Sequence, residues 1–111
     1  IENLTSELAK KALEVFKEIE AGGGFLSQLK EGIIHRKIKE SASKEQHLFD
    51  KGKLILLGTN KHINNQDKMK NDLELYPFVK TNVRKTLIQP IIERRLSEKT
   101  EQTRLENESI L

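Results

Sequence analysis

The stretch Glu20-Ala21-Gly22-Gly23-Gly24-Phe25 separates two helical patterns and decides how the fold begins. Each glycine costs a helix roughly 1 kcal/mol relative to alanine, so three in succession end the helix before them. Glycine also adopts positive φ readily, which lets the backbone reverse its direction. Phe25 is then the first apolar anchor of the following segment. Taken alone, this run predicts a turn in a helix hairpin.

Both sides of the glycine run have the apolar spacing of helices. Before it, one stripe is formed by Leu4, Leu8, Ala12, Val15, Phe16 and Ile19, with Asn3 or Thr5 as the expected N-cap. After it, residues 25–29 predict a short helical turn before Gly32. A second long helix follows, with an apolar side made of Ile34, Ile38, Ala42 and Phe49. Gly52 is the expected stop of that helix.

The remainder of the chain predicts a small β element and a final helix. Residues 54–57 are a continuous apolar run between two glycines, which favours a buried strand. Residues 60–72 read as a long polar surface loop, and residues 73–79 as a second extended segment confined to an edge by its proline. The final helix is expected to begin between Leu87 and Pro90. Its charged end is either a frayed, solvated helix or a linker to another domain.

The sequence therefore predicts a mainly α fold with a small β element, organised in four segments. They are residues 1–24, a helix and its glycine turn; 25–52, a short and a long helix; 53–86, strands and a basic polar loop; and 87–111, the C-terminal helix. With 35% hydrophobic and 33% charged residues, the 111-residue chain can build only a modest core. Much of the helical surface must be wet or covered by something else. The start at Ile1 suggests a piece of a longer protein, although processing would give the same start.

Several classes of function find no support in the composition. There is no cysteine, which excludes disulfides and thiolate chemistry, and no apolar run reaches the length of a membrane span. The three histidines, His35, His47 and His62, are interpreted as surface or boundary residues without a shared metal. No nucleophile, acid–base pair or phosphate-binding loop is recognisable. We therefore predict no catalytic, cofactor-binding or metal-binding residue.

Positive charge is concentrated in the middle of the chain. Residues 53–95 carry nine basic and four acidic side chains, a net charge of +5, whereas residues 1–52 carry nine of each. A solvated lysine-rich surface is the simpler interpretation. The alternative is a basic module that binds an acidic ligand, such as the phosphates of coenzyme A. Its candidate residues are Lys53, Lys61, Arg84, Lys85, Arg94 and Arg95. No motif for nucleic-acid binding accompanies this charge.

Four blocks, in this order and spacing, resemble the methylmalonyl-CoA mutase family, and more narrowly the small (beta) subunit of the two-subunit bacterial enzyme. The blocks are Ile1-Glu2-Asn3-Leu4-Thr5; Glu20 to Phe25; Ile38-Lys39-Glu40-Ser41-Ala42 with Gln46, Asp50 and Gly52; and Gly58-Thr59-Asn60-Lys61-His62. The resemblance implies a helical segment excised from the end of a (β/α)₈ barrel and the linker that follows it. By this resemblance, residues 1–24 correspond to the last barrel helix.

The parent enzyme, by resemblance, interconverts methylmalonyl-CoA and succinyl-CoA with adenosylcobalamin. Its lower cobalt ligand belongs to an Asp-x-His-x-x-Gly motif, and the nearest string here, residues 60–65, lacks both the aspartate and the glycine. No cobalt ligand is therefore assigned to His62, and no cofactor to this segment. We expect a non-catalytic structural and assembly segment in the cytoplasm. Its expected partner is the large (alpha) subunit, with self-association of the isolated chain and neither nucleic acid nor membrane as partner.

Overall fold

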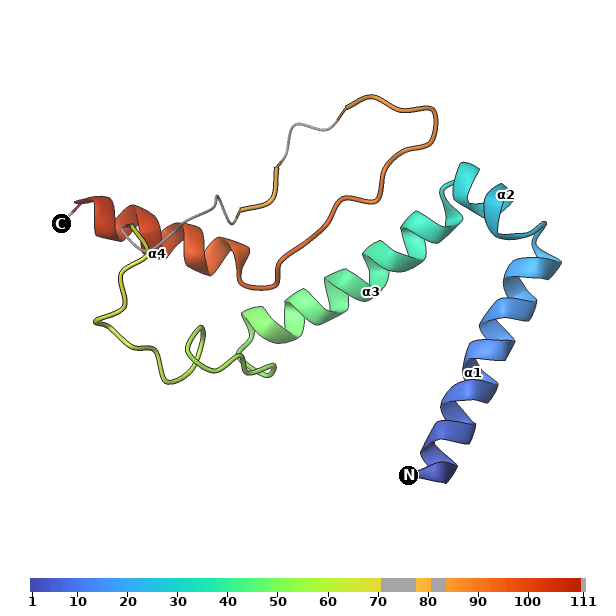
Figure 1. The fold of residues 1–111 in the computed structure, drawn as a ribbon, viewed down its shortest axis with the longest axis horizontal. Helices are drawn as coiled ribbons and strands as arrows, with labels where there is room; N and C mark the ends of the chain where they lie inside the picture. The colour runs from blue at the N-terminus through green and yellow to red at the C-terminus, as the bar shows by residue number, and fades with distance from the viewer. Residues whose placement is uncertain (71–77, 81–83, 111) are drawn as a thin grey trace. The chain divides into compact units, whose positions relative to one another are not determined.

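The structure, a computed structural model, describes residues 1–70, 78–80 and 84–110, and these contain four helices and no sheet (Figure 1). The helices are α1, Glu2–Ala21; α2, Phe25–Lys30; α3, Ile33–Asp50; and α4, Glu98–Ile110. The prediction of a mainly α fold is confirmed. None of these helices is both long enough and apolar enough to cross a membrane.

The chain divides into two compact units, and α3 contributes to both. The first unit comprises Ile1–Glu40 with Thr86–Pro90, and the second comprises Ser41–Lys85 with Ile91–Leu111. Apolar burial is sparse in each. Among the described residues, the buried apolar side chains are those of Ile34, Phe49 and Phe78. Hydrogen bonds between distant parts of the sequence therefore contribute much of the order within each unit.

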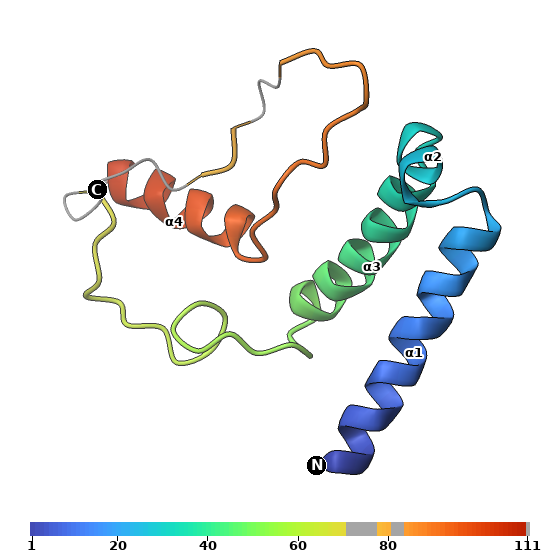
Figure 2. The ribbon, with the colours of Figure 1, turned by 45° about the vertical axis from the view of Figure 1, so that its right-hand side comes forward.

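The glycine run ends α1 as predicted, and the chain turns there into α2 (Figure 2). Two backbone hydrogen bonds shape this turn. The Gly23 N–H donates to the carbonyl of Glu20 at 3.2 Å, and the Gly24 N–H donates to that of Ile19 at 3.0 Å. These two bonds are the Schellman motif, which requires positive φ at its central residue. Gly23 has φ of 104°.

Gly22 has a different role, because it leaves room for the close approach of the Gln28 side chain. This glutamine is buried in α2, and its side-chain amide donates to the Ile19 carbonyl at 3.5 Å. A Cβ atom on residue 22 would lie only 2.1 Å from Gln28 Nε2. The turn therefore combines a conformational requirement at Gly23 with close packing of the Gln28 side chain against Gly22.

The start of α1 differs from the prediction. Neither Asn3 nor Thr5 caps the helix, because α1 already begins at Glu2 with Ile1 in the N-cap position. The Thr5 hydroxyl instead donates to the Ile1 carbonyl at 3.0 Å, within the first turn. A threonine hydroxyl satisfies a carbonyl of the preceding turn as readily as it caps an amide.

The predicted strand over residues 54–57 is wrong. Asn60 bonds the backbone groups that a strand partner would need: its amide donates to the Leu54 carbonyl, and its side-chain oxygen accepts from the Leu56 N–H, each at 2.8 Å. Only an isolated bridge between Leu57 and Lys61 forms within this loop. Residues 60–70 form a mostly exposed loop, as predicted. Of the second extended segment, residues 73–77 lie outside the described residues.

The final helix begins at Glu98, later than the predicted start between Leu87 and Pro90. A helix that started earlier would use the carbonyls of Gln89 and Leu96 as acceptors for its own backbone N–H groups. In the structure, side chains distant in sequence bond these two carbonyls. His35 Nε2 lies 2.5 Å from the Gln89 carbonyl oxygen and donates to it, while Gln46 Nε2 donates to the Leu96 carbonyl at 3.2 Å. The prediction that His35 is a surface or boundary residue is also wrong, because its side chain is buried. His47 and His62 are exposed, as predicted.

The end of α3 repeats the Schellman pattern and allows a direct test. The Gly52 N–H donates to the Phe49 carbonyl, the Lys53 N–H donates to that of Leu48, and Gly52 has φ of 70°. Replacing Gly52 with alanine should destabilise this helix end by ~1–2 kcal/mol, because left-handed backbone is unfavourable for a residue with a Cβ. Gly52→Asn should cost less, since asparagine tolerates that conformation.

Amide hydrogen exchange at Lys53 measures this effect, since its N–H bonds across the motif. Lys51→Ala, at an exposed neighbouring position, serves as the control. Equal exchange rates in the alanine and asparagine variants of Gly52 would contradict the argument.

Candidate functional site

The most highly organised polar structure in the second unit joins the end of α3 to the segment that enters α4. Gln46, in α3, donates to the Leu96 carbonyl at 3.2 Å and to Asp50 Oδ1 at 3.0 Å. Arg94 Nη1 donates to Glu45 Oε2 at 2.6 Å, and its Nη2 donates to Gln46 Oε1 at 3.2 Å. One glutamine thus uses both its donor and its acceptor to position the chain before α4.

The first turn of α4 continues this network through two carboxylates. Arg95 pairs with Glu98, with 3.2 Å between Nη1 and Oε2, and also with Glu101. The buried Ser97 hydroxyl donates to Glu101 Oε1 at 2.8 Å, and the Val79 N–H donates to Glu98 Oε1 at 2.9 Å. Carboxylates in a first turn also interact favourably with the helix dipole. We call these residues, from Glu45 and Gln46 to Glu101, the α3–α4 network.

Glu108, near the other end of α4, holds the loop that precedes residue 71. Its Oε2 accepts the backbone N–H groups of Met69 and Lys70, at 2.9 and 3.0 Å, and Oε1 also accepts from Met69 at 3.0 Å. The Met69 N–H in particular, with that of Lys70 and the charges of Lys68 and Arg104, lowers the pKa of Glu108 below its usual 4.5. Partial burial acts in the opposite direction and is outweighed.

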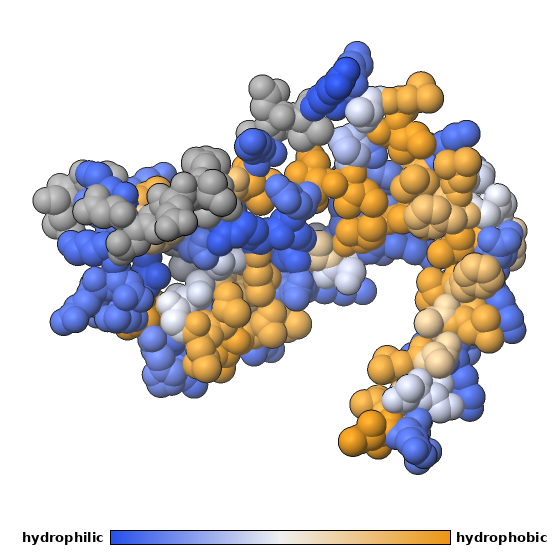
Figure 3. Space-filling model, in the orientation of Figure 1, coloured by the Kyte–Doolittle hydropathy of each residue, from blue (hydrophilic) through white to orange (hydrophobic). Residues whose placement is uncertain are grey.

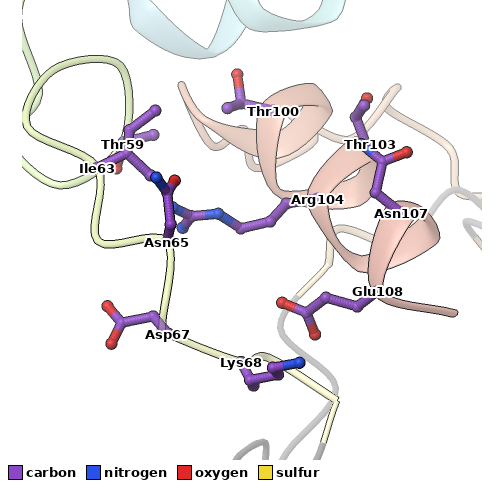
Figure 4. A pocket seen from close by; sticks show the side chains of 10 residues that line it. All are labelled: Thr59, Ile63, Asn65, Asp67, Lys68, Thr100, Thr103, Arg104, Asn107 and Glu108. Atoms are coloured by element: carbon purple, nitrogen blue, oxygen red, sulfur yellow. The ribbon is translucent and has the colours of Figure 1, made fainter. Parts of the chain in front are cut away.

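A groove of about 380 Å³ lies between this loop and α4 (Figure 4). Arg104 extends from the helix toward Asn65, while the carboxylate of Glu108 faces the loop. Both carboxylates that line the groove are engaged, Asp67 by the Asn64 side chain at 3.0 Å and Glu108 by the backbone. Arg104 Nη2 is buried without a hydrogen-bond partner. The lining also includes cations, amides and hydroxyls. Of the lining residues, Glu108 orders the loop through its bonds to Met69 and Lys70.

The candidate residues of the basic module do not form a common site. Two of them, Arg94 and Arg95, are neutralised by glutamates of their own chain. The other four, Lys53, Lys61, Arg84 and Lys85, are exposed and take part in no ion pair within the described residues. No contact among the described residues brings the six together, so the solvated-surface interpretation fits their placement better.

His62 does not form part of a cofactor pocket in the part of the chain that the structure describes. It is exposed, has φ of 55°, and lies in the turn after the Leu57–Lys61 bridge. The groove on α4 is lined by Ile63, but not by His62. An exposed imidazole without the aspartate and glycine of the ligand motif does not fit a cobalt-ligand site.

Sequence reasoning missed Gln46, Asn60 and Glu108 as structural determinants. The side chains of all three form hydrogen bonds with backbone groups that are distant in sequence or lie in irregular loops. The spacing of residues in the sequence does not reveal such bonds. The one usable signal is the abundance of glutamates in residues 98–108, which predicts a solvated helix or a linker. The segment is helical, and its Glu98, Glu101 and Glu108 also bind backbone and arginine groups.

The described residues thus form a mainly helical segment in which polar side chains fix turns and irregular backbone. The methylmalonyl-CoA mutase family model matches residues 1–108, so the chain belongs to the methylmalonyl-CoA mutase family. No solved structure matches it.

Curated relatives agree with this assignment. The mitochondrial methylmalonyl-CoA mutase of Mus musculus is 31% identical over 82% of this chain and 12% of its own length. Methylmalonyl-CoA mutase of Escherichia coli is 36% identical over 56% of this chain and 9% of its own. The enzyme from Propionibacterium freudenreichii, named as a large subunit, is 37% identical over 56% and 8%. The chain thus spans about a tenth of the length of these relatives.

Removing the bridging amide tests the α3–α4 network. Gln46→Ala should destabilise the start of α4 by about 1–3 kcal/mol, because it removes the donor to the Leu96 carbonyl and the acceptor of Arg94 Nη2. Glu45→Ala removes only an exposed ion pair and should cost about 0–1 kcal/mol. Exchange of the Glu101 amide, which bonds to Ser97, reports on that helix start. Similar effects of the two variants would argue against the bridging role.

Acidification tests the Glu108 contact. A carboxylate whose pKa is lowered in the folded state contributes stability above its unfolded pKa and loses it as pH falls through the folded value. The contact should therefore be complete at neutral pH and be lost only below about 4.5. NMR shifts of the Met69 and Lys70 amides follow this transition. It should disappear in Glu108→Gln and persist in Glu106→Gln; persistence in both would be inconsistent with the assignment.

Proposed function

We propose that this chain is a structural and assembly segment of the small subunit of a two-subunit methylmalonyl-CoA mutase. In this proposal it carries no catalytic group and contributes to binding the large subunit. The family match over residues 1–108 supports the mutase context, and the blocks described above carry the small-subunit assignment. The cytoplasm, expected from the sequence, is part of the same proposal.

The exposed apolar side of α1 is the observation that carries the structural role. No residue of this 20-residue helix is buried, and even its large apolar side chains face solvent. Leu4, Leu8 and Phe16 are 61%, 59% and 58% exposed. Figure 3 shows apolar side chains along one side of α1 and polar ones along the other. Covering each such side chain is worth roughly 1.5–3 kcal/mol, so a stripe of this length favours a packed state strongly.

The rest of the mutase is the proposed cover for this stripe. In the resemblance, α1 corresponds to the last helix of a barrel, whose apolar face packs on the strands inside. The parent enzyme would interconvert methylmalonyl-CoA and succinyl-CoA, with adenosylcobalamin supplying the radical chemistry. The isolated segment would instead hide its stripe by self-association, as expected from its sequence.

A single charge within the stripe tests this role. In the full chain, produced together with the large subunit, Leu8→Asp should reduce the yield of assembled enzyme by about tenfold or more, because it places a carboxylate in an apolar contact. Mutase activity should fall in proportion to that yield, while the activity of each assembled complex stays unchanged. Co-purification through a tag on the large subunit, followed by a turnover assay, measures both quantities.

Ser6→Asp is the matched control, since it adds the same carboxylate to the polar side of the same helix. It should assemble like the unmodified chain. Assembly of Leu8→Asp at the unmodified yield would show that the stripe stays in water and would refute the proposal. The basic-module alternative gains no support from the placement of its six cations, and titration calorimetry with coenzyme A at low salt checks it directly.

A further inference from the structure

The loop that follows α3 is shaped by internal hydrogen bonds, although it contains no regular secondary structure. Within residues 54–61, the Asn60 side chain bonds both Leu54 and Leu56, as described above. The Thr59 and Asn60 N–H groups donate to the Leu56 carbonyl at 3.0 and 3.2 Å, and the Gly58 N–H donates to that of Lys61 at 2.8 Å. These internal bonds hold several backbone groups of the loop in place.

This ordered loop presents aliphatic side chains to solvent. Ile55, Leu56 and Leu57 are consecutive and are 49%, 41% and 73% exposed. Single exposed leucines are common on protein surfaces, but three in succession on a fixed backbone form a contiguous apolar projection. We call these three residues the aliphatic knob.

Positive charge flanks the aliphatic knob along the sequence. Lys51, Lys53 and Lys61 flank it along the chain, all three are exposed, and none forms an ion pair within the described residues. The acidic residue closest to the knob along the sequence, Asp50, accepts a hydrogen bond from Gln46. An apolar centre with a charged rim is the usual anatomy of a protein–protein contact.

We propose that the aliphatic knob inserts into an apolar pocket bordered by carboxylates on a protein partner. Charge complementarity selects an acidic rim, and the fixed loop lowers the conformational entropy lost on binding. A shaped pocket benefits from such a fixed projection, whereas a fluid lipid surface gains little from it. The partner tested is the large subunit of the mutase, and in this respect the inference rests on the proposed function.

Binding of the full chain to the immobilised large subunit tests this contact. Leu57→Asp should raise the Kd at least about tenfold, because it replaces an apolar anchor with a charge. Gln66→Asp, an exposed polar position in the following loop, adds the same charge and should leave the Kd unchanged. Lys53→Ala should weaken the dependence of the association rate on salt.

A second variant examines the role of the fixed backbone. Asn60→Ala retains all three aliphatic side chains but removes both side-chain bonds that shape the loop, and it should also raise the Kd. Because Leu57 is largely exposed, its substitution should leave the fold intact. Unchanged exchange of the Asn60 amide in Leu57→Asp verifies this.

The outcomes separate the two proposals. Unchanged affinity of Leu57→Asp, in an experiment where the unmodified chain binds, overturns the knob contact and leaves the proposed function standing. Absence of binding by the unmodified chain overturns both. Flotation with phosphatidylserine vesicles provides a further comparison: vesicle binding that depends on Leu57 would assign the knob to a membrane surface and overturn the protein pocket.

Discussion

Hydrogen bonds from long side chains to distant backbone carbonyls set the path of this chain where apolar packing is sparse. His35 reaches Gln89 in one unit, and Gln46 reaches Leu96 in the other. Each such bond contributes a net of about 0.5–1.5 kcal/mol, whereas ordering one residue of backbone costs about 1–2 kcal/mol. A few bonds can select the path of a segment, but they cannot hold it against that entropy without further burial.

This imbalance connects the fold to the proposed role. Ile34, Phe49 and Phe78 are the buried apolar side chains among the described residues, while a full helical stripe on α1 faces water. A segment of this kind gains stability when its surroundings cover the stripe. The chain spans about a tenth of the length of its curated relatives, and the proposed function takes the remainder of a mutase as the cover for the stripe.

Helix positions and helix stops were predictable because they follow from local chemistry. The run at Gly22 to Gly24 and the glycine at residue 52 ended α1 and α3 where expected, since the Schellman motif needs only neighbouring residues. The apolar run at 54–57 misled, because a side chain six residues away took the place of a strand partner. The late start of α4 and the burial of His35 depended on contacts about fifty residues apart, which periodicity does not encode. For the same reason, no pattern pointed to the Glu108 contact or to the groove beside it.

The turn between α1 and α2 also links two positions of the sequence. The side-chain amide of Gln28 occupies the space that a Cβ on residue 22 would need, so these two residues share one volume. A larger residue at position 22 is compatible with this turn only when residue 28 is shortened or turned away. Among members of the family that keep the turn, the two positions are therefore expected to vary together, although neither would be singled out by its own chemistry.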